Sequence, residues 1–365
     1  MRSQSRPRPR GARSRTRLRS VLLAALVVAA VGVAAVSAPV GAQSGPDASP
    51  TCSFPVSETD ATDTTVTVTE RPERIVVLQP STAQTVWELG AADRVVGAPV
   101  GPYTGYLAGI GTREDVTNAD EFSVNREAVV ALEADVVLAA NVVPDDTVSG
   151  LRAADQTVFV FGFGTSLSSV AEKTELTGRL IGSCGAATDA NAQYRDRIEA
   201  VENATEGRES PRVLHYSGGP AGHVVAGSGT FIDEIITTAG GTNVAAENGI
   251  EGYGQISDEA VVEWDPEVIL VSEDGSGVPD SEAFASTFAV RNDQVVAVDG
   301  NYLSQPGPRV VIAIEELAAA LEAAETDGGN TAAGSESDPE DAPGFGAAAA
   351  LIALAVGVLL AERRR

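Results

Sequence analysis

The chain has 365 residues, and its 51 acidic side chains outnumber 25 basic ones, which gives a net charge of −26 at pH 7. This charge disfavours nucleic acid or another polyanion as a partner, because like charges repel. Hydrophobic residues make up 43% of the chain, so a buried core can form, and the length is sufficient for two lobes with cores of their own.

The first 42 residues contain eight arginines and no acidic residue, with an apolar run from Val21 to Val36. Together with Val40-Gly41-Ala42, this pattern is typical of a secretory signal peptide that is cut after Ala42. An uncleaved anchor helix is the alternative. Residues 43–70 are rich in Ser, Thr, Asp and Pro, which predicts a disordered leader with one possible short strand at 65–69.

The first lobe is predicted over residues 71–165 and opens with an apolar strand at 75–78. A polar turn containing Gln79 and Ser81 follows the strand and leads into a helix at 83–89. Such turns, at the carboxyl ends of parallel strands, are where α/β sheets present ligand-binding groups. Further strands of this lobe are expected at 95–97, 136–139 and 158–161, with Asn141 and Phe163 just beyond the last two.

One twelve-residue pattern occurs twice, as EAVVALEADVVL at Glu127–Leu138 and as EAVVEWDPEVIL at Glu259–Leu270. Six of the twelve positions are identical, and the copies are 132 residues apart. Each copy predicts a short amphipathic helix, an acidic break and a buried parallel strand. The spacing suits a whole α/β lobe, so two similar lobes are expected, with the functional site between them.

An interlobe helical segment is predicted over residues 166–208, with helices at 167–181 and 186–202. The second of these helices would cross between the lobes and restrict hinge motion. The second lobe is predicted over residues 209–324. Its strands are expected at 212–216, 268–271 and 295–298, its helices at 231–238 and 310–323, and its loops at 217–229 and 248–255.

The C-terminal region has two parts. Residues 325–342 are acidic and poor in apolar side chains, which predicts a flexible stalk. Residues 343–365 comprise Pro-Gly-Phe, a short apolar stretch and terminal arginines. They resemble the PGF-type archaeal sorting signal, which implies removal of the helix and attachment to a lipid. An uncleaved tail anchor is the alternative, and in both cases the body is tethered outside the cell.

Two cysteines, Cys52 and Cys184, are present in this chain, which the signal-peptide pattern predicts to be exported. A disulfide between them is favoured, because exported proteins mature in oxidising surroundings. Two free cysteines are the alternative. One glycosylation sequon occurs at Asn203-Ala204-Thr205.

Several segments resemble the ferric-siderophore and cobalamin family of substrate-binding proteins from ABC importers. Besides the doubled pattern, they are PERIVVLQPSTAQTVWELGAADRVVG at 72–97, FIDEIITTAGGTNV at 231–244 and NYLSQPGPRVVIAIEELAAAL at 301–321. The resemblance implies an α/β fold with two Rossmann-like lobes, each with a central parallel sheet. A rigid interlobe helix would join the lobes, and the ligand cleft would lie between them.

The same resemblance implies a monomeric, non-enzymatic receptor that delivers a metal chelate to an ABC permease with a cytoplasmic ATPase. It implies paired acidic contacts to the permease, which match Glu114 and Glu234 best. Corrinoid and ferric siderophore are equally supported as cargo, with haem third, and no resident cofactor is expected. The acid-rich composition with a single lysine, Lys173, is similar to that of haloarchaeal proteins.

Tyrosines in predicted loops and at strand ends suit a large flat ligand, because they offer broad surfaces with a polar tip. The predicted ligand-binding residues are Gln79, Ser81, Tyr103, Tyr106, Asn141, Phe163, Tyr216, Tyr253, Gln255, Tyr302 and Arg309. Arg309 would begin the last helix, where a cation is unfavourable. It is therefore expected either to bind an anionic ligand group or to pair with a nearby acid.

The only histidines, His215 and His223, make a weak metal site on their own. Satisfied structural roles are favoured over contact with a bound chelate. Phosphate-loop, zinc-protease and nucleophile-elbow motifs are absent from the sequence. Two other functional classes stay open: a hydrolase or metal-dependent enzyme on the same two-lobed frame, and a surface sensor without a transport role.

Overall fold

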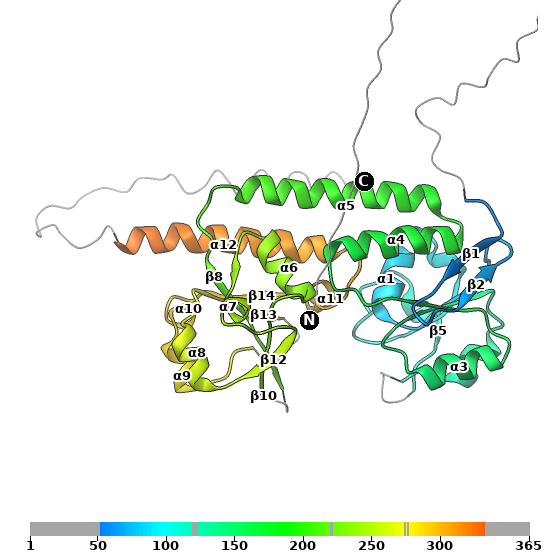
Figure 1. Cartoon of the computed structure of the whole chain (residues 1–365), viewed down its shortest axis with the longest axis horizontal. Helices are drawn as coiled ribbons and strands as arrows, with labels where there is room; N and C mark the ends of the chain where they lie inside the picture. Colours follow the sequence, from blue (N-terminus) through cyan, green and yellow to red (C-terminus); the bar gives the residue numbers. More distant parts are fainter. Residues whose placement is uncertain (1–51, 119–122, 220–221, 274, 276, 333–365) are drawn as a thin grey trace, which may run out of the picture. The chain divides into compact units, whose positions relative to one another are not determined.

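The computed structural model describes residues 52–118, 123–219, 222–273, 275 and 277–332 (Figure 1), all of which belong to one compact unit within Ser49–Arg365. The predicted signal peptide and sorting segment lie outside the described residues. None of the helices in the described ranges combines the length and apolar character needed to cross a membrane.

The first lobe is built on a parallel sheet with the strand order β5-β4-β3-β6-β7. Its strands are β3 (Ile75–Val77), β4 (Val95–Ala98), β5 (Glu114–Asp115), β6 (Val136–Ala140) and β7 (Val158–Phe161). Its helices are α1 (Pro80–Glu88), α2 (Arg126–Ala131) and α3 (Asp145–Ala153), with single 3-10 turns at Ala92–Arg94 and Ile110–Thr112. The predicted strands at 75–78, 95–97, 136–139 and 158–161 are all present.

Both faces of this sheet are covered, which explains its nearly unbroken apolar strands. Along β3, Ile75 and Val77 pack in one core cluster with α1, whereas Val76 packs in a second cluster with α2 and α3. Side chains alternate between the two faces because successive residues of a strand point to opposite sides.

The second lobe has a parallel sheet with the order β11-β8-β13-β14 and a smaller antiparallel sheet with the order β12-β10-β9. The strands are β8 (Arg212–His215), β9 (Ser217–Gly219), β10 (Gly222–Ala226), β11 (Thr242–Asn243), β12 (Tyr253–Ile256), β13 (Val268–Ser272) and β14 (Val295–Val298). The helices are α6 (Phe231–Thr238), α7 (Val244–Glu247), α8 (Asp258–Trp264), α9 (Glu282–Ser286), α10 (Phe288–Arg291), α11 (Gly300–Leu303) and α12 (Val310–Ala332).

The small antiparallel sheet corrects the sequence prediction, which assigned residues 217–229 and 248–255 to loops. These stretches contain β9, β10 and the first part of β12. Their glycines hide the strand signal, and the stabilising partner of β10 is β12, about thirty residues later in the chain. Long-range pairing of this kind is not visible in local sequence.

The doubled sequence pattern is a doubled structure. α2 leads into β6 and α8 leads into β13, and both strands lie inside their sheets. Glu133 and Asp265 occupy equivalent positions in the acidic breaks of the two copies, and both have a positive φ, of 45° and 39°. The acids two residues further on are also equivalent, because Asp135 accepts a hydrogen bond from the backbone N–H of Arg74 and Glu267 accepts one from that of Arg212.

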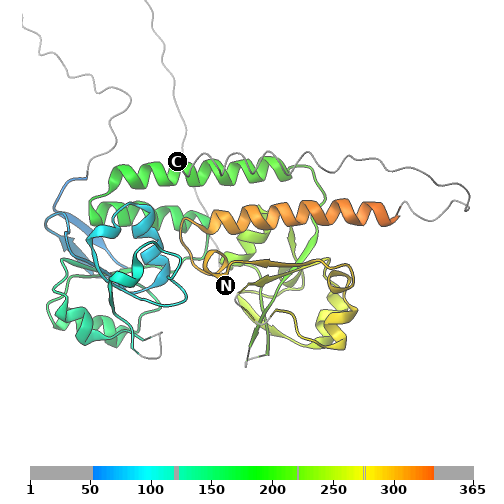
Figure 2. The same cartoon turned by 180° about the vertical axis from the view of Figure 1, so that it is seen from behind.

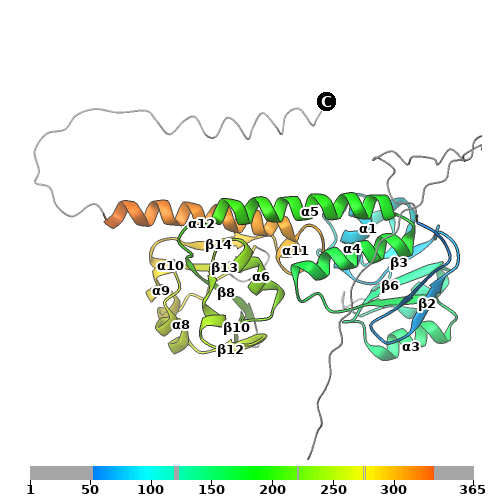
Figure 3. The ribbon, with the colours of Figure 1, turned by 45° about the horizontal axis from the view of Figure 1, so that its top comes forward.

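Two helices connect the lobes, α4 (Leu167–Ile181) and α5 (Cys184–Thr205). Figures 1 and 2 show α5 running across both lobes, and Figure 3 shows that α5 and α12 lie side by side. A bidentate ion pair between Arg197 of α5 and Glu315 of α12 links these two helices. The predicted interlobe helix is therefore present and longer than expected.

The predicted disordered leader is wrong for residues 56–68, which form a hairpin of β1 (Val56–Thr59) and β2 (Thr65–Val68). The possible strand at 65–69 is confirmed as β2. Asp60, in the turn, anchors this hairpin on the first lobe. Its carboxylate pairs with Arg152 of α3 and accepts a hydrogen bond from the Val160 backbone of β7. The anchoring depends on a contact about a hundred residues away, so composition alone could not reveal it.

Two helix boundaries also differ from the prediction. α1 begins at Pro80, three residues early, because proline is well tolerated in the first turn of a helix. α12 continues to Ala332, so the flexible stalk predicted from residue 325 does not begin there. The remainder of that stalk lies outside the described residues.

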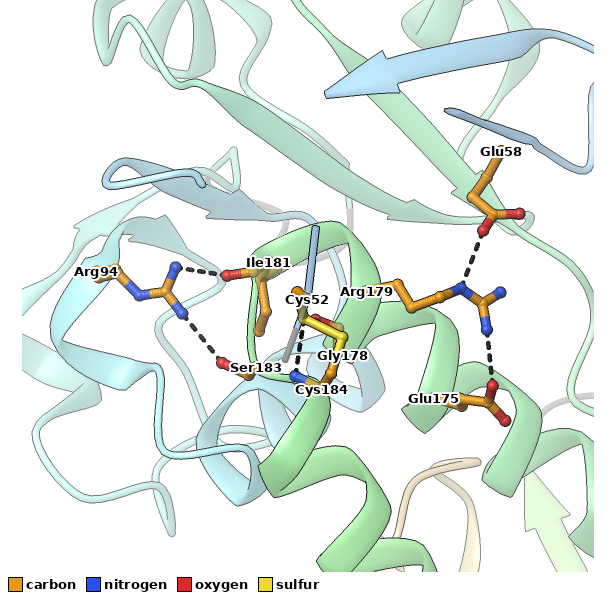
Figure 4. The surroundings of a disulfide bond; sticks show 9 residues. All are labelled: Cys52, Glu58, Arg94, Glu175, Gly178, Arg179, Ile181, Ser183 and Cys184. Atoms are coloured by element: carbon orange, nitrogen blue, oxygen red, sulfur yellow. Dashed lines mark hydrogen bonds and ion pairs between the residues drawn. A yellow bond between two sulfur atoms is a disulfide. The ribbon is translucent and has the colours of Figure 1, made fainter. Parts of the chain in front are cut away.

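Cys52 and Cys184 form the expected disulfide, with their Cα atoms 5.4 Å apart. The bridge ties the segment before β1 to the start of α5 (Figure 4). Close by, the buried Arg94 donates hydrogen bonds to the carbonyl of Ile181, at 2.7 Å, and to the hydroxyl of Ser183, at 3.2 Å. The turn between α4 and α5 is thus fixed to the first lobe by covalent and polar contacts.

Candidate functional site

A cavity of about 820 Å³ is lined by residues of both lobes. This volume lies in the upper part of the range for small-molecule and cofactor sites. The segments around it are mostly those that follow the carboxyl ends of parallel strands, namely β3, β6 and β7 in the first lobe and β8 and β13 in the second. The site therefore forms where α/β sheets are expected to bind ligands.

Five of the predicted residues line the cavity from the first lobe: Gln79, Ser81, Tyr103, Asn141 and Phe163. The Gln79 side chain accepts a hydrogen bond of 2.8 Å from the backbone of Ala140. This bond joins the turn after β3 to the end of β6, so the polar edge of the first-lobe wall is held in place before any ligand arrives.

Tyr216 and Tyr253 line the cavity from the second lobe. Tyr253 extends from β12 of the small sheet, whereas Tyr216 follows β8 and is buried. The Tyr216 hydroxyl lies 3.2 Å from Nδ1 of His223, and Nε2 of His223 lies 2.8 Å from Asp258. His223 is therefore a satisfied structural histidine, as expected, and it positions Tyr216.

Much of the exposed apolar surface lines this cavity. Six large hydrophobic residues in the described part of the chain are exposed, and four of them line this cavity. They are Tyr103, Val142, Phe163 and Tyr253, with exposed fractions of 41%, 63%, 62% and 61%. Concentrated exposure of this kind marks a binding surface, and it suits a broad, partly apolar ligand.

His215 lies at the end of β8 and also lines the cavity. It is buried, and its Nδ1 has no hydrogen-bond partner among the described residues. Burial lowers the pKa of His215 to about 4, so the ring is neutral at physiological pH. The expectation of a fully satisfied structural histidine is therefore wrong for this residue.

Four predicted residues, Tyr106, Gln255, Tyr302 and Arg309, are not among those lining the cavity. Gln255 lies on β12 with Tyr253. The other three belong to an interlobe cluster, in which the rings of Tyr106 and Tyr302 meet edge to face with centroids 5.8 Å apart. Arg309 pairs with Glu88 of α1 and lies over the Tyr106 ring, which resolves its two predicted roles in favour of an acidic partner.

The interlobe cluster is held by hydrogen bonds between the lobes. The Tyr106 hydroxyl accepts from Gln84 at 2.9 Å and donates to Gln305 at 3.1 Å, while Gln305 donates to the Tyr103 carbonyl at 2.9 Å. Gly307 packs so closely on Gln84 that an added Cβ would lie 2.3 Å from the Gln84 side chain. The sequence analysis assigned Tyr106 and Arg309 to the ligand, but their polar groups are used between the lobes.

The two acids predicted to meet a permease differ in their surroundings. Glu114 is exposed on β5 at the edge of the first sheet. Glu234 on α6 is half-buried and accepts a hydrogen bond from the backbone of Leu167, at the start of α4. Glu234 therefore has a role inside the protein. Asn203 is exposed in the last turn of α5 and is accessible to modification.

Sequence reasoning missed Lys173 as a cavity residue. It lies on α4, and its amine donates hydrogen bonds to the Ser81 hydroxyl and the Pro306 carbonyl. The available signal was its uniqueness, since Lys173 is the only lysine in the chain. Within the described residues, no group of three or more His, Cys, Asp or Glu side chains could hold a metal ion.

Comparisons with known proteins agree with this arrangement. Residues 75–302, which span both lobes, match the family described as periplasmic binding protein. A cobalamin-binding protein of Halobacterium salinarum is 40% identical over 379 residues, covering 96% of this chain and 100% of that protein. The vitamin B12-binding protein of Vibrio cholerae is 26% identical over 258 residues, covering 69% of this chain and 90% of that protein.

Among solved structures, the periplasmic heme-binding protein RhuT from Roseiflexus sp. RS-1, in its apo form, matches with a TM-score of 0.62 and 27% identity. The match covers 69% of this chain and 98% of that one. The two-lobed α/β fold is thus shared with a protein named as heme-binding.

Proposed function

Because the chain belongs to the family of periplasmic binding proteins, we propose that it is the extracellular receptor of an ABC importer and that its cargo is a corrinoid. The observation that carries this proposal is the cavity between the lobes, of about 820 Å³ and bordered by exposed Tyr103, Val142, Phe163 and Tyr253. A flat macrocycle can cover such surfaces from both sides.

The choice of a corrinoid rests on similarity as well as on shape. The relative that matches 96% of the chain is called a cobalamin-binding protein. Haem is the second candidate, supported by the likeness to a heme-binding protein. A ferric siderophore is third in this order, since the aromatic and apolar wall favours a planar ligand over a compact polar one.

A titration tests the proposal. The purified chain, in molar potassium chloride, is mixed with cyanocobalamin, haemin or a ferric hydroxamate, and binding is followed by calorimetry. We expect saturable one-to-one binding of cyanocobalamin with a dissociation constant in the micromolar range or below, about −8 kcal/mol or better. Binding of haemin alone would assign a different cargo. Turnover of a bound ligand would favour the enzyme class.

The proposal also includes the location of the protein and its partners. The receptor is exported, tethered through its C-terminus and paired with a permease and a cytoplasmic ATPase. The acidic composition supports operation in concentrated salt, where the Debye length falls to about 3 Å. Under these conditions exposed ion pairs contribute little, so docking through Glu114 would require its carboxylate to be desolvated in the complex.

Docking can be tested in cells that depend on uptake of the cargo. If Glu114 contacts the permease, Glu114→Ala should reduce uptake while leaving ligand binding by the purified protein unchanged. Glu234→Ala is expected to reduce stability as well, because Glu234 accepts a hydrogen bond at the start of α4. Normal uptake by a folded Glu114→Ala variant would rule out this contact.

A further inference from the structure

Lys173 has an unusual position for the only lysine of a strongly acidic chain. It extends from α4 into the wall of the cavity, where its amine lies 3.0 Å from the Ser81 hydroxyl and 3.3 Å from the Pro306 carbonyl. It also lies 5.8 Å from the centroid of the Phe161 ring. All these neighbours are neutral, so none of them compensates the charge of an ammonium group.

The other charged groups around the cavity do not provide a counter-ion. Arg179, further along α4, is itself paired with Glu58 and Glu175. Glu172 is exposed on the same helix, and no ion pair joins it or another described carboxylate to Lys173. His215 is neutral at physiological pH, because burial lowers its pKa to about 4. Lys173 thus has no counter-ion among the described residues of the cavity wall.

The side chain of Lys173 keeps part of its surface accessible, and this surface belongs to the cavity wall. Water in the cavity can therefore hydrate the amine while no ligand is bound. A ligand that fills the cavity displaces this water, and an unpaired buried ammonium is strongly unfavourable. A ligand with an anionic oxygen at this position would replace hydration by a charge-assisted hydrogen bond.

From this geometry we infer that Lys173 is a specificity-determining residue that pairs with an anionic oxygen of the cargo, either a phosphodiester or a carboxylate. The inference rests on the proposed function and narrows it: the cargo must carry such a group beside its flat, apolar part. The phosphodiester of a corrinoid and the carboxylates of a haem are the two sources that the experiment has to separate.

The experiment combines ligand pairs with variants of the full chain. Cyanocobalamin is compared with dicyanocobinamide, which lacks the nucleotide and its phosphodiester, and haemin is compared with its dimethyl ester, which lacks free carboxylates. Each affinity is measured for the wild type, for Lys173→Met and for Arg197→Met. Arg197→Met is the matched control, because it removes one positive charge on α5, where Arg197 pairs with Glu315 outside the cavity.

We expect the wild type to prefer the anionic member of one pair by about tenfold to a hundredfold, the range for a hydrogen bond to a charged group. Lys173→Met should lose this preference, and Arg197→Met should keep it. A preference within the corrinoid pair identifies the phosphodiester, and one within the haem pair identifies the carboxylate. An equal preference in the wild type and in Lys173→Met would overturn the inference.

A second readout separates this inference from the proposed function. With ¹³C-lysine labelling, the chain gives one lysine side-chain signal, because Lys173 is the only lysine. Inorganic phosphate should shift this signal saturably even if none of the four macrocycles binds. In that case the anion site stands and the proposed cargo is wrong. No shift with phosphate and no preference within either pair would leave Lys173 as a structural tie between Ser81 and Pro306, which overturns the inference.

Discussion

At the scale of single residues, Lys173 connects the binding site to stability. Burial lowers the pKa of its amine from 10.5 to about 7, so protonation is less favourable in the folded chain than in the unfolded one. Between pH 7 and 10.5 the unfolded state binds more protons, and stability therefore rises with pH. Below pH 7 the full penalty of the buried charge is present.

Lys173→Met should remove this penalty. Without ligand, its stability relative to the wild type should be greater at pH 6 than at pH 10, by about 2 kcal/mol after allowing for the partial exposure of the side chain. Denaturant unfolding at the two pH values measures the difference. If the stability difference between the variant and the wild type is the same at both pH values, the pKa of the amine is the same in the folded and unfolded states.

The residue scale also shows what the sequence could predict about the site. Residues that directly follow parallel strands, such as Gln79, Asn141 and Tyr216, were predicted correctly as cavity residues. Their position follows from chain order and strand direction alone. Tyr106 was misassigned, and the two roles of Arg309 could not be separated, because their partners, Gln305 and Glu88, are more than 190 residues away in the chain.

At the scale of elements, the hairpin β1-β2 depends on one buried carboxylate. The Asp60 side chain has no exposed surface, and it pairs with Arg152. Burial alone would raise the pKa of Asp60, but hydrogen bonds from Thr62, Thr64 and Val160 outweigh it and lower the pKa. The carboxylate thus stabilises the fold above its ordinary pKa, and this contribution is lost as pH falls below it.

Asp60→Asn tests this anchor. It leaves Arg152 partly buried without its partner, which should cost about 3 kcal/mol. Hydrogen exchange should quicken in β1 and β2 more than in the interior strands β3 and β6. Arg71→Gln, which removes an exposed ion pair with Glu73, should change stability by less than about 1 kcal/mol. Equal effects of the two substitutions would show that the hairpin is held by other contacts.

Elements with local signals were predicted well. The repeated helix and strand pattern was recognised because its apolar periodicity and acidic break lie within twelve residues. The small sheet of β9, β10 and β12 was missed, since glycines interrupt its strands and its pairing is long-range. The same reason applies to the hairpin, whose anchor on α3 cannot be deduced from the composition of residues 43–70.

At the scale of the whole molecule, the disulfide closes a long segment of chain. Cys52 and Cys184 are 132 residues apart, and the chain-entropy account of such a loop gives a stabilisation of up to about 5 kcal/mol. The double variant Cys52→Ser with Cys184→Ser should unfold at lower denaturant concentration. The wild type treated with a reductant should match it, and an unchanged midpoint in both would mean that the bridge does not restrict the unfolded chain.

The interlobe cluster joins the two lobes through hydrogen bonds of Gln305 to Tyr106 and Tyr103. Tyr106→Phe removes only the hydroxyl that bonds to Gln84 and Gln305. Because these two buried amides then lose a partner, we expect a loss of about 2 kcal/mol in the free energy of unfolding. Gln305 also lines the cavity, so ligand affinity should fall together with stability.

Tyr302→Phe is the matched control for this change. It keeps the edge-to-face contact with the Tyr106 ring, and no hydrogen bond of the Tyr302 hydroxyl is found among the described residues. Its stability should therefore stay within about 0.5 kcal/mol of the wild type. If Tyr106→Phe loses stability but binds ligand normally, the cluster joins the lobes without shaping the cavity. A loss of both properties would show that the fixed geometry between the lobes is part of the binding site.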